Sequence, residues 1–246
     1  MTTRRALVTG AGHGIGQAIA AKLAAAGYIV GVLDLNAQNA ESVAGELEGA
    51  MALVADVTDA QSIDAALDAF GTAPNLLVNN AGIVHFGPVI EESLDDFVRV
   101  ITVNLIGCYI ASRQAVQRMS AGDHIVSITS INDRTPAPGS GAYPAAKAGV
   151  RQLMRQLAVE LGDRRIRANS VCPGFIDAGM SEPIYANAKI RTARSAAVPV
   201  GRLGTAQDVA NAVAFLDSEA GSYVNGHELV VDGGVIHTLL KHLPRD

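Results

Sequence analysis

The chain has 246 residues, of which 49% are hydrophobic and 17% are charged, and its formal net charge is −5. This composition excludes a disordered chain and argues against a general nucleic-acid binder. No stretch has the length and apolarity of a membrane span, and the N-terminus does not resemble a signal peptide, so we expect a cytoplasmic protein. Two cysteines, Cys108 and Cys172, are too few for a disulfide framework, and no metal-ligand spacing occurs, so no metal is predicted.

Strand and helix patterns alternate along the chain, because short apolar runs predict strands and apolar residues at helical spacing predict helices. The predicted strands are 6–9, 28–34, 52–57, 75–82, 124–130, 166–174 and 227–234, and the predicted helices are about 15–26, 37–48, 59–70, 95–119, 143–161 and 206–217. This alternation predicts one α/β domain over 1–246, a doubly wound sheet of about seven parallel strands with helices on both faces. A looser stretch, 175–205, is expected to form a short, mobile pair of helices over a substrate pocket.

Glycines cluster between the first strand and the first helix. Gly10, Gly14 and Gly16 allow the backbone to turn tightly and to approach a ligand closely. The free N–H groups at the start of the helix, together with the helix dipole, suit a pyrophosphate. The spacing differs from G-x-G-x-x-G, whose third glycine would fall at Ile15, and the loop alone leaves a nucleotide site and an ordinary turn equally open.

Tyr143 and Lys147 lie four residues apart in a predicted helix, and Ser130 ends the fifth predicted strand. Positions i and i+4 share a helix face, so the lysine ammonium is expected to favour the phenolate and to lower the pKa of the phenol. The serine hydroxyl, for which Thr129 competes, would hold a substrate oxygen against that phenol. On these residues alone, an exposed helix with an ordinary tyrosine and lysine is the alternative. Pro144 requires the helix to begin very near Tyr143.

Together these features resemble the short-chain dehydrogenase/reductase family, and the resemblance covers nearly the full length of the chain. Each motif is short, but their joint order and spacing are highly specific. The resemblance implies a Rossmann-type fold, a homotetramer with two-fold axes, and hydride transfer between NAD(H) and a small-molecule secondary alcohol or ketone. The matching motifs are Thr9-Gly10-x-x-x-Gly14-Ile15-Gly16, Asp56-Val57, Asn79-Asn80-Ala81-Gly82, Asn104, Ser130, Tyr143-x-x-x-Lys147, Pro173-Gly174 and Asp232-Gly233-Gly234.

The resemblance also implies catalytic roles. Tyr143 would be the acid/base, Lys147 would bind the nicotinamide ribose and stabilise the tyrosinate, and Ser130 would bond the reacting oxygen. Asn104 would hold a water that links Lys147 to solvent. The alternatives are that Asn104 only caps or kinks its helix and that Ser130 is only a turn residue.

For the dinucleotide, the resemblance implies that Asp34 bonds the adenosine ribose and repels a 2′-phosphate, so NAD is predicted and NADP is less favoured. His13 is a weak opposing signal, and Asp34 has the alternative of being a solvated turn residue. The implied contacts are Gly10, Gly14, Ile15 and Gly16 at the pyrophosphate, Asp34, Asp56, Val57, Asn80, Ala81 and Gly82 along the adenosine half, and Tyr143, Lys147, Pro173, Gly174 and Ile176 toward the nicotinamide.

The chain departs from the family pattern at Ala178, where a threonine usually bonds the nicotinamide carboxamide, so Ile176 would carry more of that contact. The C-terminal tail is expected either to fray or to pack Leu239, Leu240 and Leu243 on a neighbouring subunit.

Cations gather around the expected substrate pocket and leave two interpretations open. They are solvated or contact a neighbouring subunit, or one arginine turns inward and pairs with an anionic substrate. The cations concerned are Arg134, Lys189, Arg191 and Arg194. The expected function is an NAD-linked dehydrogenase; the alternatives are an NADPH-dependent 3-ketoacyl-thioester reductase of the same family and a binding protein on the same scaffold.

Overall fold

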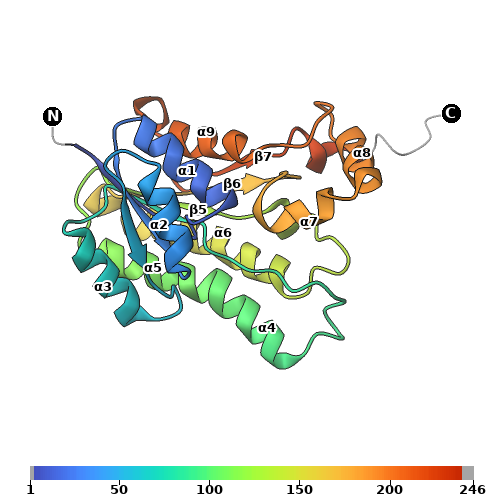
Figure 1. Cartoon of the computed structure of the whole chain (residues 1–246), viewed down its shortest axis with the longest axis horizontal. Coiled ribbons are helices and arrows are strands. Elements are labelled where there is room, and N and C mark those ends of the chain that lie inside the picture. The colour runs from blue at the N-terminus through green and yellow to red at the C-terminus, as the bar shows by residue number, and fades with distance from the viewer. Residues whose placement is uncertain (1–2, 240–246) are drawn as a thin grey trace.

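The fold is organised around one parallel sheet of seven strands, in the order β3-β2-β1-β4-β5-β6-β7. The computed structural model describes residues 3–239 and is drawn in Figure 1. It confirms the predicted doubly wound α/β class. The strands are β1 (Arg5–Thr9), β2 (Ile29–Asp34), β3 (Met51–Val54), β4 (Leu76–Asn79), β5 (His124–Ile128), β6 (Arg167–Pro173) and β7 (Glu228–Val231).

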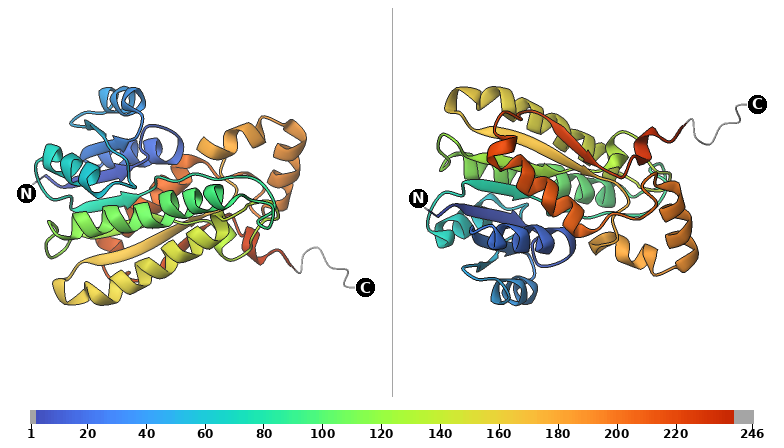
Figure 2. Two further views of the ribbon diagram at one scale, coloured as in Figure 1. Left: turned by 90° about the horizontal axis from the view of Figure 1, so that it is seen from below. Right: turned by 90° about the horizontal axis from the view of Figure 1, so that it is seen from above.

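Helices cover both faces of the sheet, and each face has its own apolar core. Helices α1, α2 and α9 pack on one face, and α3, α5 and α6 pack on the other (Figure 2). The helices are α1 (Gly14–Ala25), α2 (Ala37–Gly45), α3 (Ala60–Phe70), α4 (Leu94–Ile101), α5 (Gly107–Val116), α6 (Tyr143–Glu160), α7 (Glu182–Tyr185), α8 (Ala188–Ala197) and α9 (Ala206–Leu216). The shorter helical turns are η1 (Thr102–Ile106), η2 (Ile131–Asp133), η3 (Gly162–Arg164), η4 (Gly179–Ser181), η5 (Glu219–Gly221) and η6 (Val235–His237).

The central strands are buried on both faces, which explains their largely apolar sequences. Every residue of β4 and β5 is buried. Several helices begin at side chains that accept a bond from a first-turn N–H group, as Ser93 does for α4 and Thr205 does in the capping box of α9. Strand order reverses between β1 and β4, so the loops that follow these two strands diverge and open a crevice at the carboxyl edge of the sheet.

The helix predicted over 95–119 differs from the structure in two respects. A π-helical turn, η1, separates α4 from α5, and Asn104 lies in that turn and donates from Nδ2 to Val100 O at 2.9 Å. The α-helix ends at Val116, earlier than predicted, because the chain tightens into a turn in which Arg118 N bonds Ala115 O at 2.9 Å, three residues back. No helix in the described range is long and apolar enough to cross a membrane.

The stretch 175–205 forms the predicted pair of helices, α7 and α8, which project beyond the carboxyl edge of the sheet in Figure 1. We call residues 175–205 the lid, after the covering role that the sequence predicts for them. The chain then returns to the sheet through α9 and β7. Leu239 is exposed at the end of the described chain, whereas Leu240 and Leu243 lie outside the described residues.

Candidate active site

A cavity of about 980 Å³ opens at the carboxyl ends of the strands, where the loops after β1, β2, β4, β5 and β6 meet the lid. Of the predicted site residues, Gly16 and Asn104 lie outside its lining. The predicted residues that line the cavity are Gly10, Gly14, Ile15, Asp34, Asp56, Val57, Asn80, Ala81, Gly82, Ser130, Tyr143, Lys147, Pro173, Gly174 and Ile176. The fold therefore brings nearly all of them together from distant parts of the sequence.

The glycine loop after β1 adopts a backbone that only glycine tolerates well. Gly10 and Gly14 have φ values of 61° and 59°. A Cβ at Gly10 would lie 2.8 Å from Ala81 Cα, and one at Gly14 would lie 2.8 Å from Gly179 Cα in the lid. No side chain caps α1, so its N-terminal N–H groups stay available as donors to an anion in the cavity.

Two further residues support this loop from behind. A Cβ on Gly16 would clash with Gly10 O, so its missing side chain permits the loop to fold back on α1. Asn80 donates from Nδ2 to Thr9 O at 3.1 Å and to Gly10 O at 2.9 Å. Asn80 thus fixes the loop in addition to lining the cavity.

Asp34 is buried at the end of β2, so the alternative of a solvated turn residue is wrong. Its Oδ2 accepts from Gly12 N at 2.9 Å and its Oδ1 accepts from Asn36 N at 3.0 Å. The carboxylate therefore ties the glycine loop to β2 and still borders the cavity, where each oxygen has a lone pair left for a ligand hydroxyl. Leu35 beside it is 70% exposed and adds no positive charge.

The predicted proton-transfer residues lie at the start of α6. The helix begins at Tyr143, and Pro144 occupies its first turn, as predicted. Ser130, just after β5, lines the same cavity as Tyr143. Lys147 lies one turn further along, with its Nζ 5.5 Å from the Tyr143 ring centroid and 3.0 Å from Ile128 O.

The expectation that Lys147 lowers the pKa of Tyr143 is wrong for this structure. Burial raises the pKa of Tyr143 to about 12, although the Ser130 hydroxyl opposes the rise. Burial also lowers the pKa of Lys147 to about 8. Both shifts have one physical cause, since removal from water disfavours the charged form of each group.

Thr129, the alternative to Ser130, has its hydroxyl engaged elsewhere. Its Oγ1 donates to Glu228 Oε1 at 2.7 Å and belongs to a buried polar network, although the residue also borders the cavity. Glu228 also accepts from Arg134 Nε at 2.8 Å. Arg134 and Glu228 lie 94 residues apart in sequence, so no local pattern could have revealed this network.

The same network brings Asp133, Cys172 and Glu228 within 4.8 Å of one another, which resembles a metal-ligand set. The chemistry does not fit a cation. Arg151 Nε lies 3.0 Å from Asp133 Oδ2, and Arg134 pairs with Glu228. Burial raises the pKa of Cys172 to about 12, so its thiol keeps the proton that a metal ligand must lose.

Asn104 is buried behind the cavity, and its side chain has one oxygen without a hydrogen-bond partner within residues 3–239. Its Nδ2 donates to Ile83 O at 2.8 Å and to Val100 O at 2.9 Å. A Cβ on Gly82 would lie 2.5 Å from Asn104 Oδ1 and 3.5 Å from Lys147 Nζ. The absence of that Cβ leaves the Asn104 oxygen and the Lys147 amine facing the same small space.

The cavity fits a dinucleotide. It offers an uncapped helix start for a pyrophosphate, a buried carboxylate for ribose hydroxyls, and a tyrosine–lysine–serine group beside the remaining space. A doubly wound fold with such a cavity defines a dinucleotide-dependent oxidoreductase.

Comparison with known proteins gives the family. A family model described as enoyl-(acyl carrier protein) reductase matches residues 10–236. The 2,5-dichloro-2,5-cyclohexadiene-1,4-diol dehydrogenase LinX of Sphingobium indicum is 35% identical, covering 93% of this chain and 94% of that protein. The 3-oxoacyl-[acyl-carrier-protein] reductase FabG of Pseudomonas aeruginosa is 38% identical, with coverages of 94% and 96%. A solved oxidoreductase of the short-chain dehydrogenase/reductase family from Burkholderia thailandensis superimposes with a TM-score of 0.89 at 32% identity, with coverages of 96% and 94%.

The chain therefore belongs to the short-chain dehydrogenase/reductase family. It is an NAD(P)-dependent oxidoreductase that acts on a CH–OH group and interconverts it with a carbonyl group.

Proposed function

We propose that the protein is an NAD-linked dehydrogenase of a small-molecule secondary alcohol, with Tyr143 as its acid/base. The observation that carries the proposal is the arrangement of Ser130, Tyr143 and Lys147 around one cavity. Bound dinucleotide supplies or accepts the hydride, while the protein positions the reactants and moves the proton.

In alcohol oxidation, the phenolate form of Tyr143 takes the hydroxyl proton on Oη, and Ser130 Oγ holds the reacting oxygen and shares the charge that develops on it. Lys147 binds the nicotinamide ribose, and its ammonium stabilises the phenolate beside it. A water between Asn104 Oδ1 and Lys147 Nζ then carries the proton toward solvent. The shared space beside Gly82 supports this relay.

The same proposal assigns the dinucleotide contacts. The N–H groups of Gly14, Ile15 and Gly16 bind the pyrophosphate, and Asp34 binds the adenosine ribose. Asp56, Val57, Asn80, Ala81 and Gly82 contact the adenosine half, and Pro173, Gly174 and Ile176 contact the nicotinamide, since these residues line the cavity together with Gly10. Metal plays no part in the proposed reaction.

NAD is preferred over NADP because the buried Asp34 carboxylate would face a 2′-phosphate. The second candidate is an NADPH-dependent 3-ketoacyl-thioester reductase, which the 38% identity to FabG favours. We further propose a cytoplasmic homotetramer, which the exposed apolar residues of α4, η1 and α5 support.

The test uses Tyr143→Phe, which keeps the ring and removes the proton-carrying oxygen. NADH absorbance is followed with a panel of polyols, hydroxy acids and cyclic alcohols, with NAD and NADP in parallel. We expect the parent protein to reduce NAD and Tyr143→Phe to lose at least about a hundredfold in kcat while it still binds NADH. Tyr223→Phe is the matched control, since Tyr223 is fully exposed.

Asp34→Asn tests the cofactor preference, because it removes the charge and keeps one acceptor for the backbone. The parent is expected to favour NAD by about tenfold or more in kcat/KM, since tenfold corresponds to about 1.4 kcal/mol, and Asp34→Asn to narrow that ratio. Near-normal turnover in Tyr143→Phe would refute the mechanism, and equal kcat/KM for NAD and NADP in the parent would refute the preference.

A further inference from the structure

Of the three arginines expected near the substrate pocket, two are already paired, and a fourth, Arg99 of α4, also lines the cavity. Arg134 donates to Glu228. Arg191, on α8, lies 2.6 Å and 3.0 Å from the two oxygens of Asp177 and also donates to Tyr185 O at 3.0 Å. These contacts fasten the lid and the network behind β5. Both guanidinium groups are engaged with carboxylates, and neither residue lines the cavity.

Arg194 is the exception. It lies in the last turn of α8 and lines the cavity. Its guanidinium carbon lies 5.0 Å from the Phe175 ring centroid and 5.5 Å from that of Tyr185. The two rings support the guanidinium by cation–π contact, and this contact itself uses none of the N–H groups.

The hydrogen-bonding capacity of Arg194 is therefore largely unused within the described chain. A guanidinium has five N–H donors. One described bond uses them, from Nη1 to Tyr185 Oη at 3.3 Å, and no carboxylate within residues 3–239 forms a salt bridge with Arg194. Tyr185 is itself 2% exposed, so the ring that supports Arg194 cannot easily move away.

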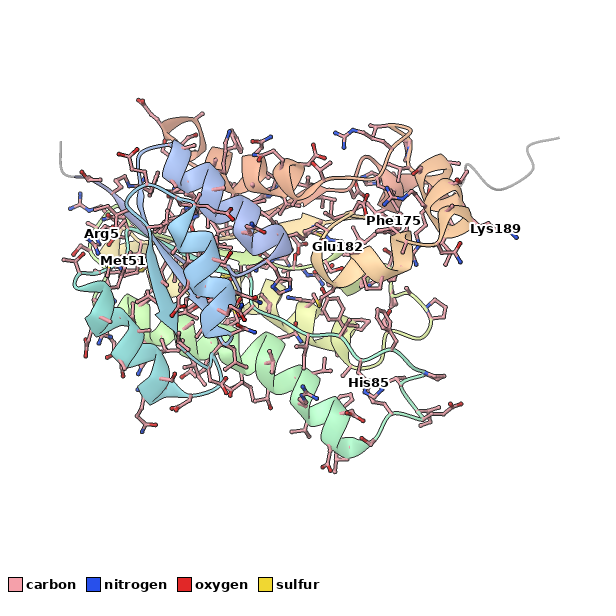
Figure 3. The ribbon with its side chains drawn as sticks, in the orientation of Figure 1. Arg5, Met51, His85, Phe175, Glu182 and Lys189 are labelled. Atoms are coloured by element: carbon pink, nitrogen blue, oxygen red, sulfur yellow. The ribbon has the colours of Figure 1, made fainter. Side chains whose placement is uncertain are left out.

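Apolar side chains of the lid border the same cavity as Arg194. They include Phe175, Met180 and Ile184. In Figure 3, Phe175 lies on the inner side of α8, whereas Lys189 of the same helix projects outward. A cation held among apolar side chains at a cavity wall gains most from an anionic partner, and guanidinium geometry suits a carboxylate.

We propose that Arg194 is the anion-binding residue of the substrate pocket and that the substrate is a secondary alcohol bearing a carboxylate. This inference rests on the proposed dehydrogenase function of the same cavity. The dinucleotide pyrophosphate is the rival anion, because the lid touches the glycine loop where Gly179 meets Gly14. Activity and NADH binding together distinguish a substrate carboxylate from the pyrophosphate as the partner of Arg194.

The experiment compares each hydroxy acid with its methyl ester, which has the same carbon skeleton and no charge. 2-Hydroxybutyrate, 3-hydroxybutyrate and 4-hydroxypentanoate and their esters are assayed with NAD in four proteins: the parent, Arg194→Met, Arg194→Lys and Lys189→Ala. Methionine keeps a packing stem over the rings and removes the charge. Lys189→Ala removes one positive charge from the exposed side of the same helix.

We expect the parent to prefer an acid to its ester in kcat/KM. Arg194→Met should reduce that acid-to-ester ratio by about tenfold to a hundredfold, since a hydrogen bond to a charged group contributes about 1.5–3 kcal/mol and each 1.4 kcal/mol is tenfold. Arg194→Lys should restore part of the ratio, and Lys189→Ala should leave it unchanged. An unchanged ratio in Arg194→Met overturns the inference, even if all alcohols are oxidised normally and the proposed function stands.

NADH binding, measured by fluorescence in the same four proteins, shows whether Arg194 binds the dinucleotide pyrophosphate instead. If Arg194→Met weakens NADH binding and leaves the acid-to-ester ratio intact, the guanidinium serves the pyrophosphate and the inference is wrong. If the parent oxidises no alcohol, the proposed function fails instead. The inference is then decided by the thermal shift that succinate causes with NADH present: a shift in the parent and Lys189→Ala that Arg194→Met loses supports it, and no shift in the parent overturns it.

Discussion

At the scale of single residues, the pKa values of Tyr143 and Lys147 are set by burial more than by attraction between the two groups. Lys147 is 4% exposed, and its pKa falls to about 8, while that of Tyr143 rises to about 12. In the protein without ligands, the lysine therefore loses its proton several pH units before the tyrosine does. Below pH 8 the pair is an ammonium beside a neutral phenol, and above pH 8 both groups are neutral.

This order of deprotonation predicts that one lysine has an abnormally low titration midpoint. The chain has four lysines, so ¹³C labelling of the lysine side chains gives few signals to follow by NMR. In the ligand-free protein we expect one signal to titrate with a midpoint near 8 and to disappear in Lys147→Arg. The other signals should titrate near the ordinary lysine value of about 10.4.

Tyr143→Phe supplies the control for this titration. Desolvation is the cause of the lowered pKa of Lys147, so the midpoint should stay near 8 without the phenol. A midpoint that returns toward 10.4 in Tyr143→Phe, or a Lys147 signal that is ordinary in the parent, would contradict this account of the pair.

At the scale of elements, the segment α4–η1–α5 shows how one side chain shapes a helix. Asn104 donates both amide hydrogens to backbone carbonyls, one in its own helix at Val100 and one in the loop after β4 at Ile83. The second bond anchors the loop that carries Ala81 and Gly82 beside the cavity. The π-helical turn directs Asn104 inward, behind Lys147, as such turns often do at functional sites.

Asn104→Ala should therefore weaken both stability and activity. It removes two bonds to buried carbonyls, and we expect a loss of about 1–3 kcal/mol in the free energy of unfolding, measured with urea. Turnover should also fall, because the loop at Ile83 loses its anchor. Asn211→Ala is the matched control, since Asn211 is exposed on α9 and its side chain bonds only Gln207 among residues 3–239, and its effect should stay within about 0.5 kcal/mol. Equal stability of Asn104→Ala and the parent would contradict the structural role.

At the scale of the whole molecule, the outer surface of α4, η1 and α5 carries more apolar area than a monomer needs. Leu94, Ile106 and Tyr109 are 75%, 43% and 48% exposed, and Val159 on the neighbouring α6 is 80% exposed. The two helical segments lie side by side on one face in Figure 2. Such a surface is typical of subunit contacts.

Light scattering at micromolar concentration is expected to give the mass of a tetramer for the parent. Ile106→Asp combined with Tyr109→Asp should lower the mass, because two buried carboxylates would face the contact between subunits. Val54→Asp is the control, since Val54 is similarly exposed on the edge strand β3, far along the sheet from α6. A monomeric parent, or an unchanged mass in the double variant, would refute the tetramer.

Much of the fold could be predicted because its signals are local. The apolar run of β1, the glycines that follow it and the spacing of Tyr143 and Lys147 are each read within a few residues. The pKa values of that pair could not be predicted, since they depend on how deeply distant elements bury it. The bond from Thr129 to Glu228 joins residues 99 apart, so only the folded sheet reveals that the Thr129 hydroxyl is engaged away from Ser130.

The close approach of Gly14 to Gly179 has a consequence for how the two ligands influence each other. The start of α1 and the start of the lid leave no room for a side chain between them, so a shift of one is expected to displace the other. If a dinucleotide binds the glycine loop as proposed, it should bias the position of the lid and, with it, the proposed alcohol pocket. Thermodynamic linkage makes that influence mutual: by whatever factor the dinucleotide tightens alcohol binding, the alcohol tightens dinucleotide binding by the same factor.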